Sequence, residues 1–178
     1  MPFVWTLLEV VEEKRGSAKQ QIKACRHVIA RLEFSSWKSS SPPPAGSIRK
    51  ALSSMNSGVY LAIFYLARTQ VITVGRLGRF TFQPGHYLYV GIAQRCLQAR
   101  LARHGQRCKP MRWQIDYLSA RAPLVGALVL RGPKSWECRL AAILAKHYLR
   151  PIARFGASDC RCGGHLFYCP IGRDRNAG

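Results

Sequence analysis

The chain has 178 residues, of which 48% are hydrophobic, which is enough for the core of one ordinary domain and excludes a wholly disordered chain. It carries 28 Lys and Arg against 8 Asp and Glu, a formal net charge of +20. This excess indicates a polyanionic partner, with nucleic acid ahead of an anionic membrane surface. Ribosomal and other structural RNA-binding proteins share such a charge, so charge alone does not select an activity.

Seven cysteines without a secretory leader indicate a reducing compartment. The first residues, MPFVWTLLEVVEEK, contain no basic leader, and Glu9 interrupts their apolar run. We therefore expect a cytoplasmic, nucleoid-associated protein without a disulfide framework. No apolar run approaches the length of a membrane-spanning helix, so we expect no membrane partner.

Residues 1–50 are predicted to form a basic N-terminal extension that ends in a Ser/Pro-rich linker. The segment QQIKACRHVIARLEF places Ile22, Cys25, Ile29 and Leu32 at helical spacing. This spacing predicts a basic amphipathic helix, which either docks on the domain or serves as an additional nucleic-acid arm. The segment SWKSSSPPPAGS contains three successive prolines, which favour an extended linker, so we place a domain boundary there.

Residues 55–170 are predicted to form one α+β domain, a small and mainly antiparallel sheet flanked by helices, and residues 171–178 a tail. Strands are expected in GVYLAIFYL (58–66), QVITV (70–74), HYLYVG (86–91) and LVGALVL (124–130). The first three are expected to form an antiparallel meander, in which Ala67–Thr69 joins the first two strands and glycines in GRLGRF and Pro-Gly supply turns before the third. LQARLARH (97–104) predicts a short basic helix. A second helix is expected over Ser135–Leu149, with Ser135 as its N-cap and Glu137 in its first turn.

The order of these motifs resembles the GIY-YIG nuclease superfamily. GVY ends at Tyr60, YVG begins at Tyr89, and an arginine and a glutamate follow on helices at Arg100 and Glu137. The segments RLARH, WQIDYL, WEC and FGASDCRCGGHLFY are similar to an uncharacterised archaeal and bacterial branch of that superfamily, sometimes fused to endonuclease III. This branch usually has His where the chain has Gln114, and Ser where it has Ile92.

The resemblance implies a metal-dependent endonuclease that hydrolyses phosphodiester bonds in DNA. Tyr60 then corresponds to the proposed general base, and we expect the positive charge around Arg100 to lower its pKa. Arg100 would stabilise phosphoryl charge, Tyr89 would orient water or phosphate, and His104, on the same helix face, would assist proton transfer or hold the phosphate. Glu137 would bind one Mg²⁺ or Mn²⁺.

Each of these residues also has a purely structural interpretation. Tyr60 and Tyr89 suit a β-sheet as ordinary aromatic residues, and Arg100 suits a simple phosphate clamp. The helix dipole by itself explains a histidine at a C-terminus, such as His104, and an acid in a first turn, such as Glu137. It is their joint presence, in the order of the superfamily, that favours catalysis.

The segment DCRCGGH forms a separate candidate site, with Asp159, Cys160, Cys162 and His165 within seven positions. Two thiols and an imidazole at this spacing suit Zn²⁺ if Cys138 or Cys169 supplies a fourth ligand. The alternative is a tight glycine-rich turn in which the acid caps backbone N–H groups and the cysteines are small apolar residues. A further alternative places the aspartate and histidine of this segment in the cleft of Glu137.

Nucleic-acid contacts are expected from basic residues around the first helix, namely Arg95, Arg103, Lys109 and Arg112. We expect a role in DNA repair or recombination, with a DNA-repair enzyme as a partner, because of the family association. Two other functions fit the sequence. One is a nucleic-acid-binding accessory module that does not cleave, and the other is an RNA-binding protein stabilised by zinc.

Overall fold

The computed structural model describes residues 7–11 and 56–170. The predicted amphipathic helix around Ile22, the Ser/Pro-rich linker and the tail lie outside the described residues. Within the described part of the chain, no helix is long and apolar enough to cross a membrane.

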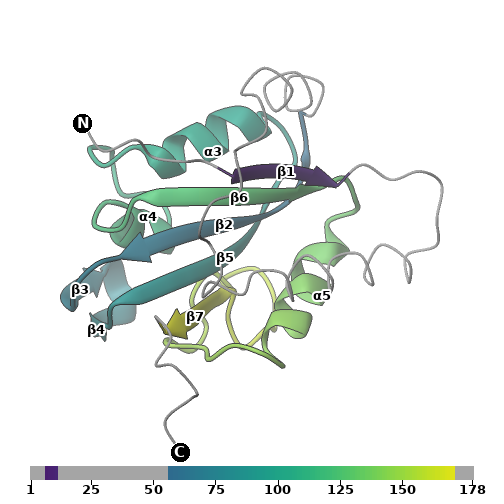
Figure 1. Cartoon of the computed structure of the whole chain (residues 1–178). Coiled ribbons are helices and arrows are strands. Elements are labelled where there is room, and N and C mark those ends of the chain that lie inside the picture. Colours follow the sequence, from purple (N-terminus) through teal and green to yellow (C-terminus); the bar gives the residue numbers. More distant parts are fainter. Residues whose placement is uncertain (1–6, 12–55, 171–178) are drawn as a thin grey trace, which may run out of the picture.

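A five-stranded sheet forms the centre of the fold, with strand order β1-β6-β2-β5-β7 (Figure 1). Its members are β1 (Leu7–Val11), β6 (Leu124–Leu130), β2 (Gly58–Leu66), β5 (Gly85–Ala93) and β7 (Leu166–Pro170). Every neighbouring pair is antiparallel except β1 and β6, which are parallel. The described helices are α3 (Leu97–Gly105), α4 (Gln114–Ser119) and α5 (Ser135–Leu144). A 3-10 turn (Gly75–Leu77) joins β3 (Gln70–Val74) to β4 (Gly78–Phe82). The predicted α+β class, with a mainly antiparallel sheet, is confirmed.

Both faces of the sheet are buried, because successive side chains of a strand point to opposite faces. Along β2, Tyr60, Ala62 and Phe64 belong to one core, and Val59, Leu61 and Ile63 belong to the other. Residues of α3 and α4 complete the first core, and residues of α5 complete the second. Tyr60 therefore faces α3, whereas α5 covers the opposite face.

The predicted meander is wrong in its pairing. β2 pairs with β5 along its whole length, from Gly58 opposite Ala93 to Leu66 opposite Gly85. Between them, β3 (Gln70–Val74) and β4 (Gly78–Phe82) pair with each other as a separate two-stranded sheet. The pairing of β2 with β5 brings GVY and YVG together, so Tyr60 lies directly opposite Gly91.

The second predicted helix is shorter than expected. Helix α5 ends at Leu144 rather than Leu149, because the chain turns and Leu149 then forms an isolated bridge with Tyr168. Its N-cap is Lys134, and the predicted cap Ser135 is the first helical residue. Helix α4 and the strands β1, β4 and β7 were not predicted as regular elements.

Candidate active site and metal cluster

Tyr60 lies in the core, and its hydroxyl meets an imidazole. The distance from Tyr60 Oη to His104 Nε2 is 2.8 Å, and both residues are 1% exposed. Helix α3 brings the histidine there because Leu97, Leu101 and His104, at positions i, i+4 and i+7, form its buried stripe. The interpretation of His104 as a solvated helix-terminal residue is therefore wrong.

The glycine of YVG makes room for the tyrosine of GVY. A Cβ atom on Gly91 would lie 2.5 Å from both Cζ and Oη of Tyr60, a distance that a real side chain does not reach. Gly58 is confined in a similar way, since a Cβ there would lie 2.8 Å from the carbonyl oxygen of Leu130. The glycines of both motifs thus have steric reasons in this fold, and one of them bears directly on Tyr60.

Burial sets the protonation states of this pair. It raises the pKa of Tyr60 well above its ordinary value, and the neighbouring Tyr89 adds to that rise. The charge and hydrogen bonding of Arg100 oppose the rise without cancelling it. Burial and the nearby Lys109 lower the pKa of His104 to about 4. The expected lowering of the Tyr60 pKa is therefore wrong, and His104 is unprotonated at neutral pH.

Tyr89 completes an aromatic group around this hydrogen bond. Its ring centroid is 6.5 Å from that of Tyr60 and 6.1 Å from that of His104. Burial and the charge of Glu137 raise its pKa, so its hydroxyl stays protonated and can orient a bound group. The structure therefore brings together three of the predicted catalytic residues, Tyr60, Tyr89 and His104.

Arg100 lies over the indole ring of Trp113, with its Cζ 4.4 Å from the ring centroid. Such cation–π stacking holds a guanidinium in place while its N–H groups remain available. Arg100 also acts on Tyr60, as the pKa of that tyrosine shows. Arg100 and His104 were predicted to project from the same face of the helix, and both act on Tyr60. No sequence pattern indicated that Trp113 supports this arginine.

The expected nucleic-acid contacts divide into two groups. Arg103 and Lys109 form ion pairs with the buried Asp116, at 2.8 and 3.7 Å from its carboxylate oxygens. The negative charge of this acid therefore partly offsets their positive charge. The same carboxylate accepts hydrogen bonds from two backbone N–H groups at the start of α4 and has a lowered pKa. Arg95 and Arg112 are exposed and remain available to solvent or phosphate.

Glu137 lies in the first turn of α5 and is 8% exposed. Its Oε1 is 3.5 Å from Nδ1 of His165, whose side chain is 1% exposed. The charge of the carboxylate raises the pKa of both Tyr60 and Tyr89, so it acts on the aromatic group as well. Glu137 thus lies beside His165 of the C-terminal Cys/His segment, as one alternative expected, and its charge also reaches the two candidate catalytic tyrosines.

A Cys/His cluster occupies the other side of His165. One donor atom from each of Cys138, Cys160, Cys162 and His165 lies within 4.8 Å of every other, so the four residues could hold a metal ion. Burial and the neighbouring thiols Cys138 and Cys160 raise the pKa of Cys162 to about 12, an effect that a bound cation would reverse. Of the two fourth ligands considered, the structure places Cys138 in the group and leaves Cys169 outside it.

Asp159 does not belong to this cluster. Its side chain is 62% exposed and lies 3.4 Å from Nζ of Lys134, an ion pair of a kind that contributes little. Gln114, where the similar branch usually has His, accepts a hydrogen bond from the backbone N–H of Gly156. It therefore joins α4 to the loop beside Tyr89. Ile92 packs with the second core, on the face covered by α5.

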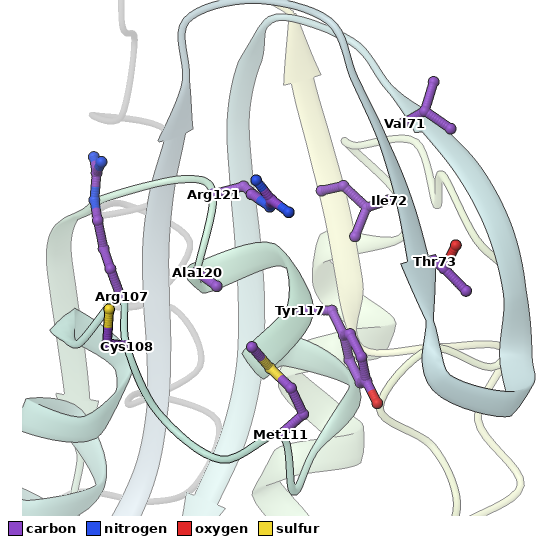
Figure 2. Close-up of a pocket in the computed structure, with 9 residues that line it drawn as sticks. All are labelled: Val71, Ile72, Thr73, Arg107, Cys108, Met111, Tyr117, Ala120 and Arg121. Carbon is purple, nitrogen blue, oxygen red and sulfur yellow. The ribbon is translucent and has the colours of Figure 1, made fainter.

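A pocket of about 560 Å³ lies elsewhere, between β3 and α4 (Figure 2). Its walls come from β3, from the loop before α4 and from α4 itself, as Ile72, Met111 and Tyr117 illustrate (Figure 2). None of the predicted catalytic or metal-binding residues lines it. The candidate site is thus defined by contacts between side chains and not by this cavity.

Comparison with known proteins places most of the chain in one family. The family model described as domain of unknown function DUF123 matches residues 59–177, from the second residue of β2 to beyond the end of β7. No curated protein and no solved structure matches the chain. Because the matched segment covers more than half of the chain, the chain belongs to the DUF123 family.

Proposed function

We propose that the chain is a metal-dependent endonuclease that hydrolyses phosphodiester bonds in DNA. The hydrogen bond between Tyr60 and the neutral His104 is the observation that carries this proposal. It provides a proton acceptor at neutral pH, buried beside an arginine, in a protein with a net charge of +20. The resemblance of the motifs to the GIY-YIG superfamily supports the same reaction, and repair or recombination is the setting that this resemblance suggests.

Tyr60 would act as a proton relay. Its raised pKa keeps the phenol protonated, so it cannot remove a proton from water as a free phenolate. In the tautomer that carries its proton on Nδ1, His104 leaves Nε2 free to accept the phenolic proton at 2.8 Å. Tyr60 would pass its proton to His104 while taking one from the attacking water. A bound phosphate would favour this step, since negative charge nearby raises the pKa of His104.

Arg100 would bind the phosphate. A guanidinium offers parallel N–H donors that match two phosphoryl oxygens, and stacking on Trp113 fixes its plane. Its charge would be more strongly attracted as negative charge builds up on these oxygens in the transition state. Tyr89, still protonated, would donate a hydrogen bond to water or phosphate. Arg95 and Arg112, both exposed, would add contacts to the flanking backbone.

The acidic residues of the described domain, 56–170, differ in their suitability for a hard cation. Asp116 is engaged by Arg103 and Lys109, and Asp159 is exposed beside Lys134. Glu137 is buried and acts electrostatically on Tyr60 and Tyr89, so it fits a site with one carboxylate and water ligands. Mg²⁺ or Mn²⁺ bound there would supply positive charge to the phosphoryl group and the leaving 3′ oxygen.

The proposal is tested with labelled branched and single-stranded DNA, in Mn²⁺ or EDTA. Tyr60→Phe and Glu137→Gln are expected to lower the cleavage rate by about 10²–10⁴, with DNA binding retained. Tyr65→Phe, on the same strand, and Asp159→Asn, an exposed acid, are the matched controls and should cleave at the wild-type rate.

Two results would overturn the nuclease assignment. Tight DNA binding without cleavage in any divalent metal, equal in Tyr60→Phe and wild type, would indicate the accessory module. Selective RNA binding without cleavage would indicate the RNA-binding protein.

A further inference from the structure

We propose that Cys138, Cys160, Cys162 and His165 bind one structural zinc ion, and that Glu137 orients the histidine from outside the coordination shell. This assignment does not depend on the nuclease activity proposed above. It rests on the separations of the donor atoms, on the chemistry of the set and on the placement of the imidazole.

The separations suit a tetrahedral ion. With Zn–S of about 2.3 Å and Zn–N of about 2.0–2.1 Å, a tetrahedral site places a sulfur and a nitrogen about 3.6 Å apart, and two sulfurs about 3.8 Å apart. The Cys160 Sγ to His165 Nε2 distance is 3.5 Å. No two of the four donor atoms are more than 4.8 Å apart, so small side-chain rotations would complete the geometry.

The donors select the metal. Three thiolates and one imidazole form a Cys₃His set, which is typical of structural zinc and unsuited to Mg²⁺ or Ca²⁺, both of which require oxygen. The set leaves no open position for a substrate, so this ion would be structural. It would thus be a second metal, distinct in chemistry from the Mg²⁺ or Mn²⁺ proposed at Glu137.

The fold presents these donors from separate elements. Cys138 lies in the first half of α5, and Cys160 and Cys162 lie in the loop that precedes β7. His165 is fixed by its backbone, because its N–H donates to Phe155 O at 2.7 Å and its carbonyl accepts from Val90 N at 3.0 Å. An ion held by all four would tie α5 to the C-terminal loop and to the edge of the sheet.

The histidine has the surroundings of a metal ligand. Its Nε2 faces Cys160, and its Nδ1 is buried, without a hydrogen bond, 3.5 Å from Glu137 Oε1. A metal-bound histidine ordinarily donates its other N–H to a carboxylate or carbonyl, which fixes the tautomer and the ring orientation. Coordination at Nε2 would place the proton on Nδ1, facing the carboxylate. Zinc would thereby also fix the position of the side chain assigned to the catalytic cation.

The test is the metal content of the full-length protein, purified under reducing conditions without chelator. We expect one zinc per chain by elemental analysis, and a loss of zinc in Cys138→Ser and Cys162→Ser. Cys169→Ser, which changes a partly buried cysteine outside the cluster, should retain zinc. Glu137→Gln should keep the ion but lower zinc affinity about 10–100-fold in chelator competition. Tyr60→Phe should bind zinc normally whether or not the protein cleaves DNA.

Variants that fail to fold do not weaken the test, because the wild-type protein can be loaded with Co²⁺. We expect the visible absorption of tetrahedral Co²⁺ together with sulfur-to-cobalt charge transfer. The assignment is overturned if the reduced protein binds neither Zn²⁺ nor Co²⁺, if Cys138→Ser and Cys169→Ser lose zinc equally, or if Cys138 forms a disulfide with Cys162 in the native protein. Failure to cleave DNA would bear only on the proposed function.

Discussion

Protonation of His104 is expected to destabilise the folded protein at mildly acidic pH. The pKa of His104 is about 4 in the fold and 6.5 in an ordinary environment. Below pH 6.5, His104 therefore binds a proton in the unfolded chain but stays unprotonated in the folded chain. The free energy of unfolding falls as the pH is lowered, until the pH reaches about 4. The difference of about 2.5 pKa units, at about 1.4 kcal/mol each, limits the loss to about 3.5 kcal/mol. Roughly three-quarters of it is complete by about pH 4.5.

Urea unfolding of wild type and His104→Gln, measured from about pH 7.5 to about pH 4.5, isolates this contribution. The amide of glutamine does not titrate but can still hydrogen-bond to Tyr60. The lowered pKa values of His86 and Asp116 also affect stability, but they do so in both proteins and cancel in the difference. We expect wild type to lose about 2–3 kcal/mol more than His104→Gln over this range. Curves of stability against pH that run parallel would refute the buried, neutral state of His104 and with it the proton relay.

Two further predictions concern the packing around this site. Gly91→Ala should destabilise the protein by about 1–3 kcal/mol, because the new methyl group would collide with the ring of Tyr60. Gly105→Ala, whose Cβ meets no atom within 4 Å, is the matched control and should not destabilise it. Asp116→Ala should cost about 3–5 kcal/mol by chemical denaturation, since it removes the buried partner of two cations. Asp159→Ala, which breaks an exposed pair, should cost less than about 1 kcal/mol.

Local patterns predicted the long elements because these elements obey simple periodicities. β2 and β6 are continuous apolar runs, typical of strands buried on both faces, and the sheet does bury both of their faces. The helix over α3 followed from Leu97 and Leu101 one turn apart, and both are buried. In these segments the physics that sets the structure acts within a few residues.

Pairing between distant segments could not be predicted in the same way. The strands of the β3–β4 hairpin lie between β2 and β5 in the sequence, where a meander would place its middle strand. Only packing decides that β2 pairs with β5 instead. α4 has six residues, too few for a helical period to stand out, and its start depends on Asp116 accepting backbone hydrogen bonds. β7 combines five residues with a terminal proline, so its identity as a strand comes from pairing with β5.

The metal cluster shows the same limit. The sequence supplied Cys160, Cys162 and His165 as near neighbours but left the fourth ligand open between Cys138 and Cys169. Cys169, four residues after the histidine, is the nearer of the two in sequence. In the structure α5 brings Cys138 to the loop, and Cys169, which lies on β7, is not part of the group. Three-dimensional proximity therefore selected the ligand that was more remote in sequence.

The error over Tyr60 is the most informative for mechanism. A net charge of +20 favours a phenolate, but solvent and salt screen charges that are exposed and distant from a buried group. Burial acts on the hydroxyl itself, and the charges of Tyr89 and Glu137 act in the same direction, so together they outweigh the single nearby Arg100. The burial that keeps Tyr60 protonated also keeps His104 unprotonated, with its Nε2 2.8 Å from Tyr60 Oη. In the proposed mechanism the proton acceptor is therefore on the helix and not on the strand, and the tyrosine of the GVY motif would connect that acceptor to the substrate.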